Sequence, residues 1–224
     1  MHAVGIVAAA GSGLRLGADL PKALVPLAGR PLVAWAVDTL RAGGAAEVVV
    51  AVPPERRTEF AAALPGVRLV DGGATRTASV RAALAAVTGP GRPPVDAVLV
   101  HDAARPLTPP DVVARVLRAL AAGARAVVPV LPVVDTTVVV DGQGIVTDAV
   151  PRATLRRVQT PQGFDRRTLE DAYDALPDGV ELTDDAAVVR AAGVPVQTVE
   201  GDERAAKITV AHDLALAELQ AVRA

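Results

Sequence analysis

The sequence predicts an α/β fold, in which a mainly parallel β-sheet carries helices on both faces and a β-hairpin arm protrudes. Short Val-rich runs alternate with Ala/Leu-rich stretches of helical spacing, and this alternation is typical of βαβ units. The chain of 224 residues is 51% hydrophobic and 21% charged, so it can bury a substantial core and is unlike a disordered chain. Two apolar runs between Val133 and Val150 follow each other without a helix, which indicates the hairpin.

The first element in chain order is a strand over Val4 to Ala8. The alternative for this segment is a signal peptide, because Ala3 to Ala10 is apolar and ends in alanines. The segment lacks a basic n-region and continues into a Gly-rich loop, so a buried strand is favoured and we expect a cytoplasmic protein. The other Val-rich runs, which predict buried strands, are Glu47 to Val52, Val67 to Val70, Val95 to His101, Arg125 to Val130 and Val194 to Val199.

Helices are predicted where Ala and Leu recur with helical spacing between these strands. In a sheet built from such units both faces are covered, and ligands bind at the carboxyl ends of the strands. The expected architecture is therefore Rossmann-like. The stretches with helical spacing are Leu32 to Ala42, the stretch containing Val80, Leu84 and Val87, Val112 to Ala121, and Leu214 to Val222.

The predicted arm is a hairpin in which Val133 to Val140 and Ile145 to Val150 flank Asp141-Gly142-Gln143-Gly144. No long linker and no repeat interrupts the chain, so we expect a single domain over residues 1–224 with the arm over approximately residues 133–158. A two-stranded hairpin is marginal alone in water, and its apolar surface must be covered, so we expect the arm to have a partner.

The composition excludes several classes of site. The sequence has no cysteine, which excludes disulfides, thiolate metal sites and thiol nucleophiles. A histidine-based zinc site would need nearly all of His2, His101 and His212, and we do not expect one. The net charge of -2 leaves no basic excess for nucleic acid. No apolar run approaches the ~18 residues of a membrane span. We therefore expect neither nucleic acid nor a membrane as a partner.

A glycine-rich loop follows the first predicted strand, and it is followed by two cations, Arg15 and Lys22. Glycines at a strand end let backbone N–H groups approach an anion closely, and the two cations could meet a triphosphate. The spacing Gly-x-Gly-x-x-x-Gly differs from the dinucleotide fingerprint, and no P-loop Gly-Lys-Ser/Thr occurs. A plain turn with solvated charges is the alternative. The loop reads Ala8-Ala9-Ala10-Gly11-Ser12-Gly13-Leu14-Arg15-Leu16-Gly17, with Pro21-Lys22 after it.

Lysine usage favours chemistry at this loop. The 23 basic residues include two lysines, Lys22 and Lys207, and all the others are Arg. Arg could meet the need for solubility, whereas a compact ammonium beside a transferring phosphoryl group is poorly replaced by a planar guanidinium. Both lysines are therefore candidate catalytic residues.

Two more segments lie at predicted strand ends. Gly72-Gly73 precedes Arg76, Ser79 and a helix, and two glycine turns suit a nucleotide with its base at one and its phosphates at the other. In His101-Asp102-Ala103-Ala104-Arg105-Pro106, Asp102 could bind Mg²⁺ or a hydroxyl, and Arg105 could pair with it or with phosphate. A loop ion pair is the alternative for this segment.

Taken in chain order, these segments and four later ones resemble the 2-C-methyl-D-erythritol 4-phosphate cytidylyltransferase family over nearly the whole chain. The most specific pieces are the loop ending in Pro21-Lys22, His-Asp-Ala-Ala-Arg-Pro, and Lys207-Ile208-Thr209 followed by Asp213-Leu214-Ala215-Leu216-Ala217-Glu218. The other matching pieces are Gly72-Gly73 to Ser79, Asp135-Thr136, Thr160-Pro161-Gln162 and Thr183-Asp184-Asp185.

The resemblance implies a nucleotidyltransferase fold and an enzyme that joins CTP to methylerythritol phosphate, releasing pyrophosphate. It also implies Mg²⁺, which we expect to be held mainly by the CTP phosphates, and a homodimer in which the arm crosses into a second subunit. The implied catalytic cations are Arg15, Lys22 and Lys207. The implied CTP-binding residues are Ala9, Ala10, Gly11, Gly13, Gly73 and Ser79. The positions implied around the sugar phosphate are Asp102, Arg105, Thr136, Arg152 and Thr160, with Thr136 and Arg152 coming from the arm.

Several interpretations stay open beside this one. A cytidylyltransferase for another polyol phosphate, such as ribitol 5-phosphate, shares most motifs, and a non-catalytic nucleotide-binding module is an alternative of another class. Thr183-Asp184-Asp185 is explained by a helix cap with acids in the first turn. Leu14 and Ala74 stand where some members carry an Arg and an acid, which leaves only backbone roles there. Trp35 and Phe164 are expected in the core, and His101 is expected to orient the Asp102 loop.

Overall fold

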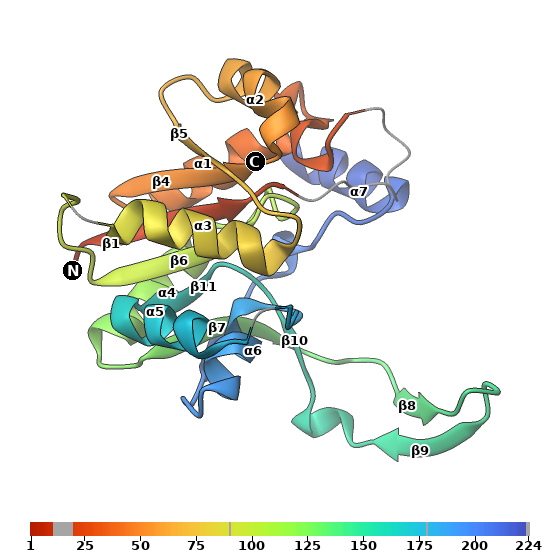
Figure 1. The fold of residues 1–224 in the computed structure, drawn as a ribbon. Coiled ribbons are helices and arrows are strands. Elements are labelled where there is room, and N and C mark those ends of the chain that lie inside the picture. Colours follow the sequence, from red (N-terminus) through yellow and green to blue (C-terminus); the bar gives the residue numbers. More distant parts are fainter. Residues whose placement is uncertain (11–19, 90, 178, 223–224) are drawn as a thin grey trace.

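A twisted sheet forms the centre of the molecule in the computed structural model, which describes residues 1–10, 20–89, 91–177 and 179–222 (Figure 1). The order of its strands is β10-β7-β11-β6-β1-β4-β5, and β12 pairs with β7. The strands are β1 (Ala3–Ala8), β4 (Glu47–Val52), β5 (Arg68–Asp71), β6 (Ala97–Asp102), β7 (Ala126–Pro132), β10 (Arg156–Val158), β11 (Gln162–Asp165) and β12 (Gln197–Glu200).

Most pairings in this sheet are parallel, as the sequence predicts. Strand β1 lies between β4 and β6, and β4 continues the parallel run to β5. Two strands are exceptions. Strand β11 is inserted antiparallel between β6 and β7, and β10 is antiparallel to β7. The predicted strands are confirmed within one to three residues at their ends, and β4 coincides with its prediction.

The helices cover both faces of the sheet, which confirms the predicted fold class. They are α1 (Leu32–Ala42), α2 (Arg57–Ala63), α3 (Arg76–Thr88), α4 (Pro110–Ala121), α5 (Arg166–Ala175), α6 (Asp185–Ala191) and α7 (Ala211–Ala221). Helices α1 and α4 pack on one face of the sheet, and α3, α5 and α6 pack on the other. No helix in the described ranges has both the length and the apolar character needed to cross a bilayer. The expected cytoplasmic location stays a prediction.

Elements β10, β11, α2 and α5 were not predicted. Strand β11 carries one large apolar residue, Phe164, so no Val-rich run marks it. Helix α5 does carry a signal, because its buried Leu169, Ala172 and Tyr173 have the i, i+3, i+4 spacing of a helix face. Phe164 lies in the core, as expected, whereas Trp35 is only half-buried and donates from its indole nitrogen to the Leu27 carbonyl (3.1 Å).

The predicted arm is a separate two-stranded hairpin of β8 (Thr137–Val140) and β9 (Val146–Val150), which extends away from the sheet in Figure 1. The Asp141 carboxylate fixes its turn by accepting from the backbone N–H groups of Gln143 and Ile145, both at 2.9 Å. The apolar side chains of the arm remain 42% to 66% exposed; they are Val134, Val138, Val139, Val140, Ile145 and Val146. The assignment of residues 1–224 to one domain stays a prediction.

We expect Gly163→Ala to lower the free energy of unfolding by about 1–3 kcal/mol, the usual cost of overpacking. A Cβ on Gly163 of β11 would lie 2.3 Å from Val116 Cγ1 of α4. Denaturant unfolding measures the loss, which a second substitution, Val116→Ala, should partly reverse. Gly142→Ala in the arm is the control, because no atom there lies within 4 Å. Equal stabilities of the Gly163 and Gly142 variants would contradict this packing.

Candidate active site

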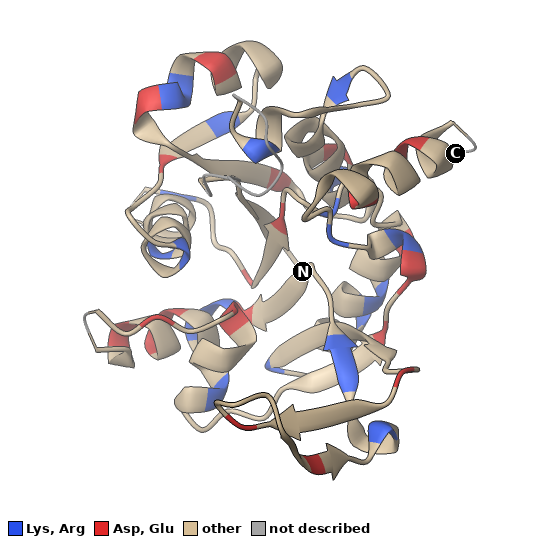
Figure 2. Cartoon of the chain, turned by 90° about the vertical axis from the view of Figure 1, so that its right-hand side faces the viewer, with Lys and Arg blue, Asp and Glu red and all other residues tan. Residues whose placement is uncertain are grey.

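A cavity of about 440 Å³ opens at the carboxyl ends of β1 and β6, which is where the fold class predicts a ligand. In Figure 2, which looks onto this side of the molecule, positions of basic and of acidic residues are interspersed along the described ribbon. We call this space the first cavity. Its lining consists of Ala8, Ala9, Ala10, Lys22, Ala23, Gly73, Ala74, Thr75, Arg76, Ser79, Asp102, Ala103, Ala104, Lys207 and Thr209.

The glycine turn after β5 forms one wall of the first cavity, and its glycines are required by close approach. A Cβ on Gly72 would lie 2.7 Å from the Ala10 Cβ, and a Cβ on Gly73 would lie 2.5 Å from the Ala78 Cβ. The Gly73 N–H donates to the buried Ser79 hydroxyl (3.1 Å), which donates to the Thr75 carbonyl (2.8 Å). The turn is thus fixed to the first turn of α3, with backbone groups facing the cavity.

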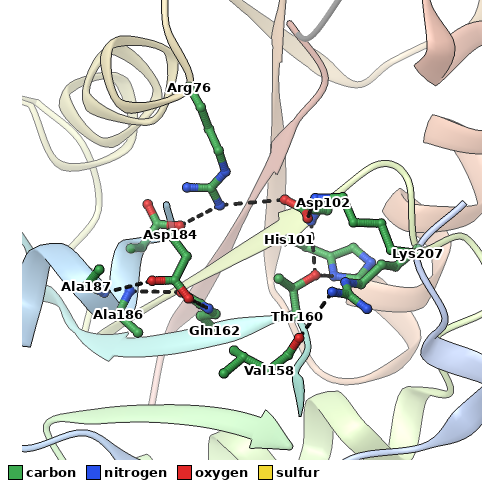
Figure 3. Close-up of polar contacts among 12 residues, drawn as sticks. Arg76, His101, Asp102, Val158, Thr160, Gln162, Asp184, Ala186, Ala187 and Lys207 are labelled. Atoms are coloured by element: carbon green, nitrogen blue, oxygen red, sulfur yellow. Dashed lines mark hydrogen bonds and ion pairs between the residues drawn. The ribbon is translucent and has the colours of Figure 1, made fainter. Parts of the chain in front are cut away.

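The Asp102 carboxylate lies at the end of β6 between two cations (Figure 3). Its Oδ2 is 2.7 Å from Lys207 Nζ, and its Oδ1 is 3.6 Å from the Arg76 guanidinium. Burial opposes ionisation of this carboxyl, but Lys207 and then Arg76 outweigh it and hold its pKa at about 2. Asp102 is therefore a permanent anion at neutral pH, and its ion-pair partners are Lys207 and Arg76, not Arg105 as the sequence allowed.

His101 lies behind Asp102 and is fully buried. Its Nδ1 is 2.8 Å from Thr160 Oγ1, and the Thr160 oxygen also accepts from the Asp102 N–H (3.1 Å). Burial lowers the pKa of His101 to about 4, although Asp102 opposes the shift. The neutral ring thus supports the strand end through Thr160, as the sequence analysis expects for a residue that orients the Asp102 loop.

A second cavity of about 180 Å³ adjoins the first on the other side of Asp102. Arg105 lines it and bridges two chain segments, donating to the Ala205 carbonyl (2.7 Å) and the Val158 carbonyl (3.2 Å). Its Nε is buried and has no partner among the described residues. The full lining is Arg76, Asp102, Arg105, Val158, Gln159, Thr160, Gln162, Thr183, Asp184 and Lys207.

The segment that carries Lys207 is fixed on both sides. Upstream, the Gln159 amide donates to the Asp202 carbonyl (2.8 Å) and accepts from the Asp202 N–H (3.0 Å). Downstream, the Ile208 N–H donates to the Ala104 carbonyl (2.8 Å), and the Asp213 carboxylate caps the start of α7. These bonds fix the backbone on both sides of Lys207, and its ammonium lies against Asp102 while the side chain stays 45% exposed.

Arg76 is the site residue that the sequence analysis did not nominate. Its guanidinium is 2.6 Å from Asp185 Oδ2, and the other oxygen of this fully buried carboxylate accepts from the Tyr173 hydroxyl (2.6 Å). The expected cap at the start of α6 is confirmed, since Asp184 accepts from the Ala187 N–H (2.8 Å). Asp185 is the expected acid in the first turn of α6, and it also forms the ion pair with Arg76. A signal was present, because Arg76 lies three residues before Ser79 on the same helix.

The structure brings together most of the predicted site residues. Ala9, Ala10, Lys22, Gly73 and Ser79 line the first cavity, Arg105 and Thr160 line the second, and Asp102 and Lys207 line both. Gly11, Gly13 and Arg15 lie outside the described residues. Thr136 and Arg152 are exposed on the arm and line neither cavity; Arg152 donates to the Val134 carbonyl (2.8 Å).

Comparison with known proteins gives one family. The model described as IspD: 2-C-methyl-D-erythritol 4-phosphate cytidylyltransferase matches residues 3–223. The 2-C-methyl-D-erythritol 4-phosphate cytidylyltransferase of Nocardia farcinica is 52% identical over 219 residues, which cover 96% of this chain and 92% of that protein.

Solved structures agree with this match. The crystal structure of 2-C-methyl-D-erythritol 4-phosphate cytidylyltransferase from Thermus thermophilus is similar with a TM-score of 0.80 and 42% identity, covering 99% of this chain and 100% of that one. The structure of 4-diphosphocytidyl-2C-methyl-D-erythritolsynthase from Anaerococcus prevotii is similar with a TM-score of 0.84 and 26% identity, covering 99% of each chain.

The buried His101 gives a prediction for stability against pH. An unfolded histidine binds a proton below about 6.5, whereas His101 stays neutral in the folded state down to about 4. The unfolded state therefore binds more protons between these values, and the free energy of unfolding should fall as the pH is lowered through this interval. His101→Gln should flatten that slope. Denaturant unfolding at several pH values measures it, with the exposed His212→Gln as control; equal slopes in both variants would contradict the assignment.

Proposed function

The chain belongs to the 2-C-methyl-D-erythritol 4-phosphate cytidylyltransferase family, and we propose that the two cavities around Asp102 are the place where its reaction occurs. The reaction transfers a cytidylyl group from CTP to 2-C-methyl-D-erythritol 4-phosphate. It yields 4-diphosphocytidyl-2-C-methyl-D-erythritol and pyrophosphate, a step of non-mevalonate isoprenoid biosynthesis. One observation carries the proposal: both lysines of the chain line the same cavity, together with the end of β1 and the glycine turn after β5.

We assign the nucleotide to the first cavity. Ala9, Ala10, Gly73 and Ser79 present a narrow wall of small side chains and backbone groups, which suits the cytosine ring better than a purine. The loop with Gly11, Gly13 and Arg15 begins directly after Ala10, so the phosphates of CTP are assigned to its side of the cavity.

The chemistry requires no general base, because the nucleophile is an oxygen of the acceptor's phosphate and is already ionised at neutral pH. It attacks the α-phosphorus in line while pyrophosphate leaves, so catalysis depends on positioning and on neutralising the charge of the transition state. Arg15, Lys22 and Lys207 are the cations that we assign to this task. Asp102 and Thr160 are assigned to the acceptor, with Arg105 at the same cavity.

We propose Mg²⁺ as the cofactor, held mainly by the phosphates of CTP. The lining of the first cavity fits this arrangement, since it includes the hard carboxylate oxygens of Asp102, which Mg²⁺ prefers as ligands. When bound, the ion would neutralise part of the phosphate charge.

The function is tested by measuring pyrophosphate release with purified protein, CTP, Mg²⁺ and 2-C-methyl-D-erythritol 4-phosphate. Ribitol 5-phosphate in place of the acceptor tests the other polyol substrate, and ATP in place of CTP tests the base. Pyrophosphate release with CTP and 2-C-methyl-D-erythritol 4-phosphate, but not with ribitol 5-phosphate or ATP, supports the assignment. Faster release with ribitol 5-phosphate, or none with either acceptor, would overturn it in favour of the second substrate or of a binding module.

Lys22→Ala should lower kcat by about 10²- to 10³-fold while weakening CTP binding much less, because its charge is needed mainly in the transition state. Lys22→Arg should recover little, because a planar fork does not occupy the position of an ammonium. Steady-state kinetics measures both. Arg30→Ala, which removes a cation paired with Asp38 on the exposed surface, is the control. A Lys22 variant with wild-type kcat would remove this residue from the mechanism.

We further propose a homodimer in which the arm of each subunit brings Thr136 and Arg152 to the partner's second cavity. The exposed apolar side chains of the arm support this, because they need a cover, and neither residue is among the described residues that line the two cavities of its own chain.

Mixing and refolding inactive Lys22→Ala with inactive Arg152→Ala chains should then restore about a quarter of wild-type activity. Half of the randomly paired dimers are hetero, and each contains one intact site and one doubly damaged site. Pyrophosphate release measures the recovery, and differently tagged chains report the heterodimers. No recovery with heterodimers present would mean that each site is built within one chain.

A further inference from the structure

Three residues line both cavities: Arg76, Asp102 and Lys207. If the nucleotide occupies the first cavity and the acceptor the second, the acceptor's phosphate and the α-phosphate of CTP meet where these residues lie. The new diphosphate linkage would form at that boundary. Two of the three residues are cations, and the assignments above use only Lys207.

Arg76 is held at this boundary by a buried anion. Its guanidinium extends from the first turn of α3 towards the space between Asp184 and Asp102 (Figure 3), and it is closest to Asp185, at 2.6 Å. Asp185 is 0% exposed and is itself fixed by the Tyr173 hydroxyl at 2.6 Å. The Asp102 carboxylate is farther from the guanidinium, at 3.6 Å.

This arrangement leaves the guanidinium usable by a ligand. The side chain of Arg76 is 30% exposed, although it pairs with a fully buried carboxylate. The contacts with Asp185 and Asp102 both involve one guanidinium nitrogen of Arg76, Nη2. A guanidinium carries five N–H donors, so the others are available to a ligand in the two cavities that Arg76 lines. Without Asp185 the guanidinium would be free to pair closely with Asp102, which would compete with Lys207 for that carboxylate.

We propose that Arg76 is a substrate-contacting residue that binds the phosphate of the acceptor at the boundary, and that Asp185 is the residue that positions it. This rests on the proposed location of the reaction. Arg76 and Lys207 then flank the oxygen that attacks and the linkage that forms, one from α3 and the other from the segment before α7.

The test is steady-state kinetics with CTP and 2-C-methyl-D-erythritol 4-phosphate. Arg76→Ala should raise the KM for the acceptor by about tenfold, the loss expected for a hydrogen bond between charged groups, and lower kcat by about 10²-fold. The KM for CTP should stay within about twofold. Asp185→Asn should change the same two parameters less, and Tyr173→Phe less again. Glu47→Gln is the control, since it weakens a less buried pair with Arg92 (2.6 Å) at the start of β4, the end remote from the cavities.

The outcomes separate the inference from the function. If Arg76→Ala turns over at the wild-type rate, the inference alone is overturned. The same holds if the variant is impaired only in its KM for CTP. Absence of turnover by the wild-type protein would overturn the proposed function and the inference with it. If Asp185→Asn does not fold, as judged by circular dichroism, Arg76→Ala and Tyr173→Phe still decide the question. Losses in Glu47→Gln equal to those in Asp185→Asn would indicate a general effect on stability and overturn the role of Asp185.

Discussion

The arrangement of the site depends on one largely buried anion, the carboxylate of Asp102, whose side chain is 13% exposed. Its charge is stable in a low-exposure environment only because Lys207 and Arg76 approach it from two different parts of the chain. Those two cations therefore cannot be placed independently of each other. Their common partner fixes where both cavities meet, and the rest of the local structure serves to hold the three groups in register.

The segment from Gln159 to Gln162 is what holds them there, because its side chains fasten three separate walls. Gln159 binds the loop that precedes Lys207, Thr160 binds the end of β6, and Gln162 accepts from the first turn of α6, where Asp185 lies. All three side chains are buried, so each exchanges hydrogen bonds with water for hydrogen bonds within the protein. The walls are thus connected by the link between β10 and β11 together with the first residue of β11, which is inserted antiparallel between β6 and β7.

The sequence predicted the parallel part of the sheet because Val-rich runs with helical segments between them determine it. It did not predict β11, where the polar Gln162 is buried and is satisfied by tertiary hydrogen bonds that no local pattern encodes. The same distinction holds at the site. A glycine pair after a predicted strand and a rare lysine stand out in the sequence, so Gly73 and Lys207 were found, whereas Arg76 is one of many arginines and is positioned by a carboxylate 109 residues away.

The electrostatics also restrict the kind of chemistry to which this site is suited. With a pKa of about 2, Asp102 carries no proton to donate at neutral pH and is too weak a base to take one, and His101, with a pKa of about 4, stays neutral. Neither group is therefore suited to acid or base catalysis. What remains is a set of fixed cations held by fixed anions, in the alternating order Asp185, Arg76, Asp102, Lys207. Such an array is suited to a reaction in which ionised phosphates approach each other, because its charges need little reorganisation as the transition state forms.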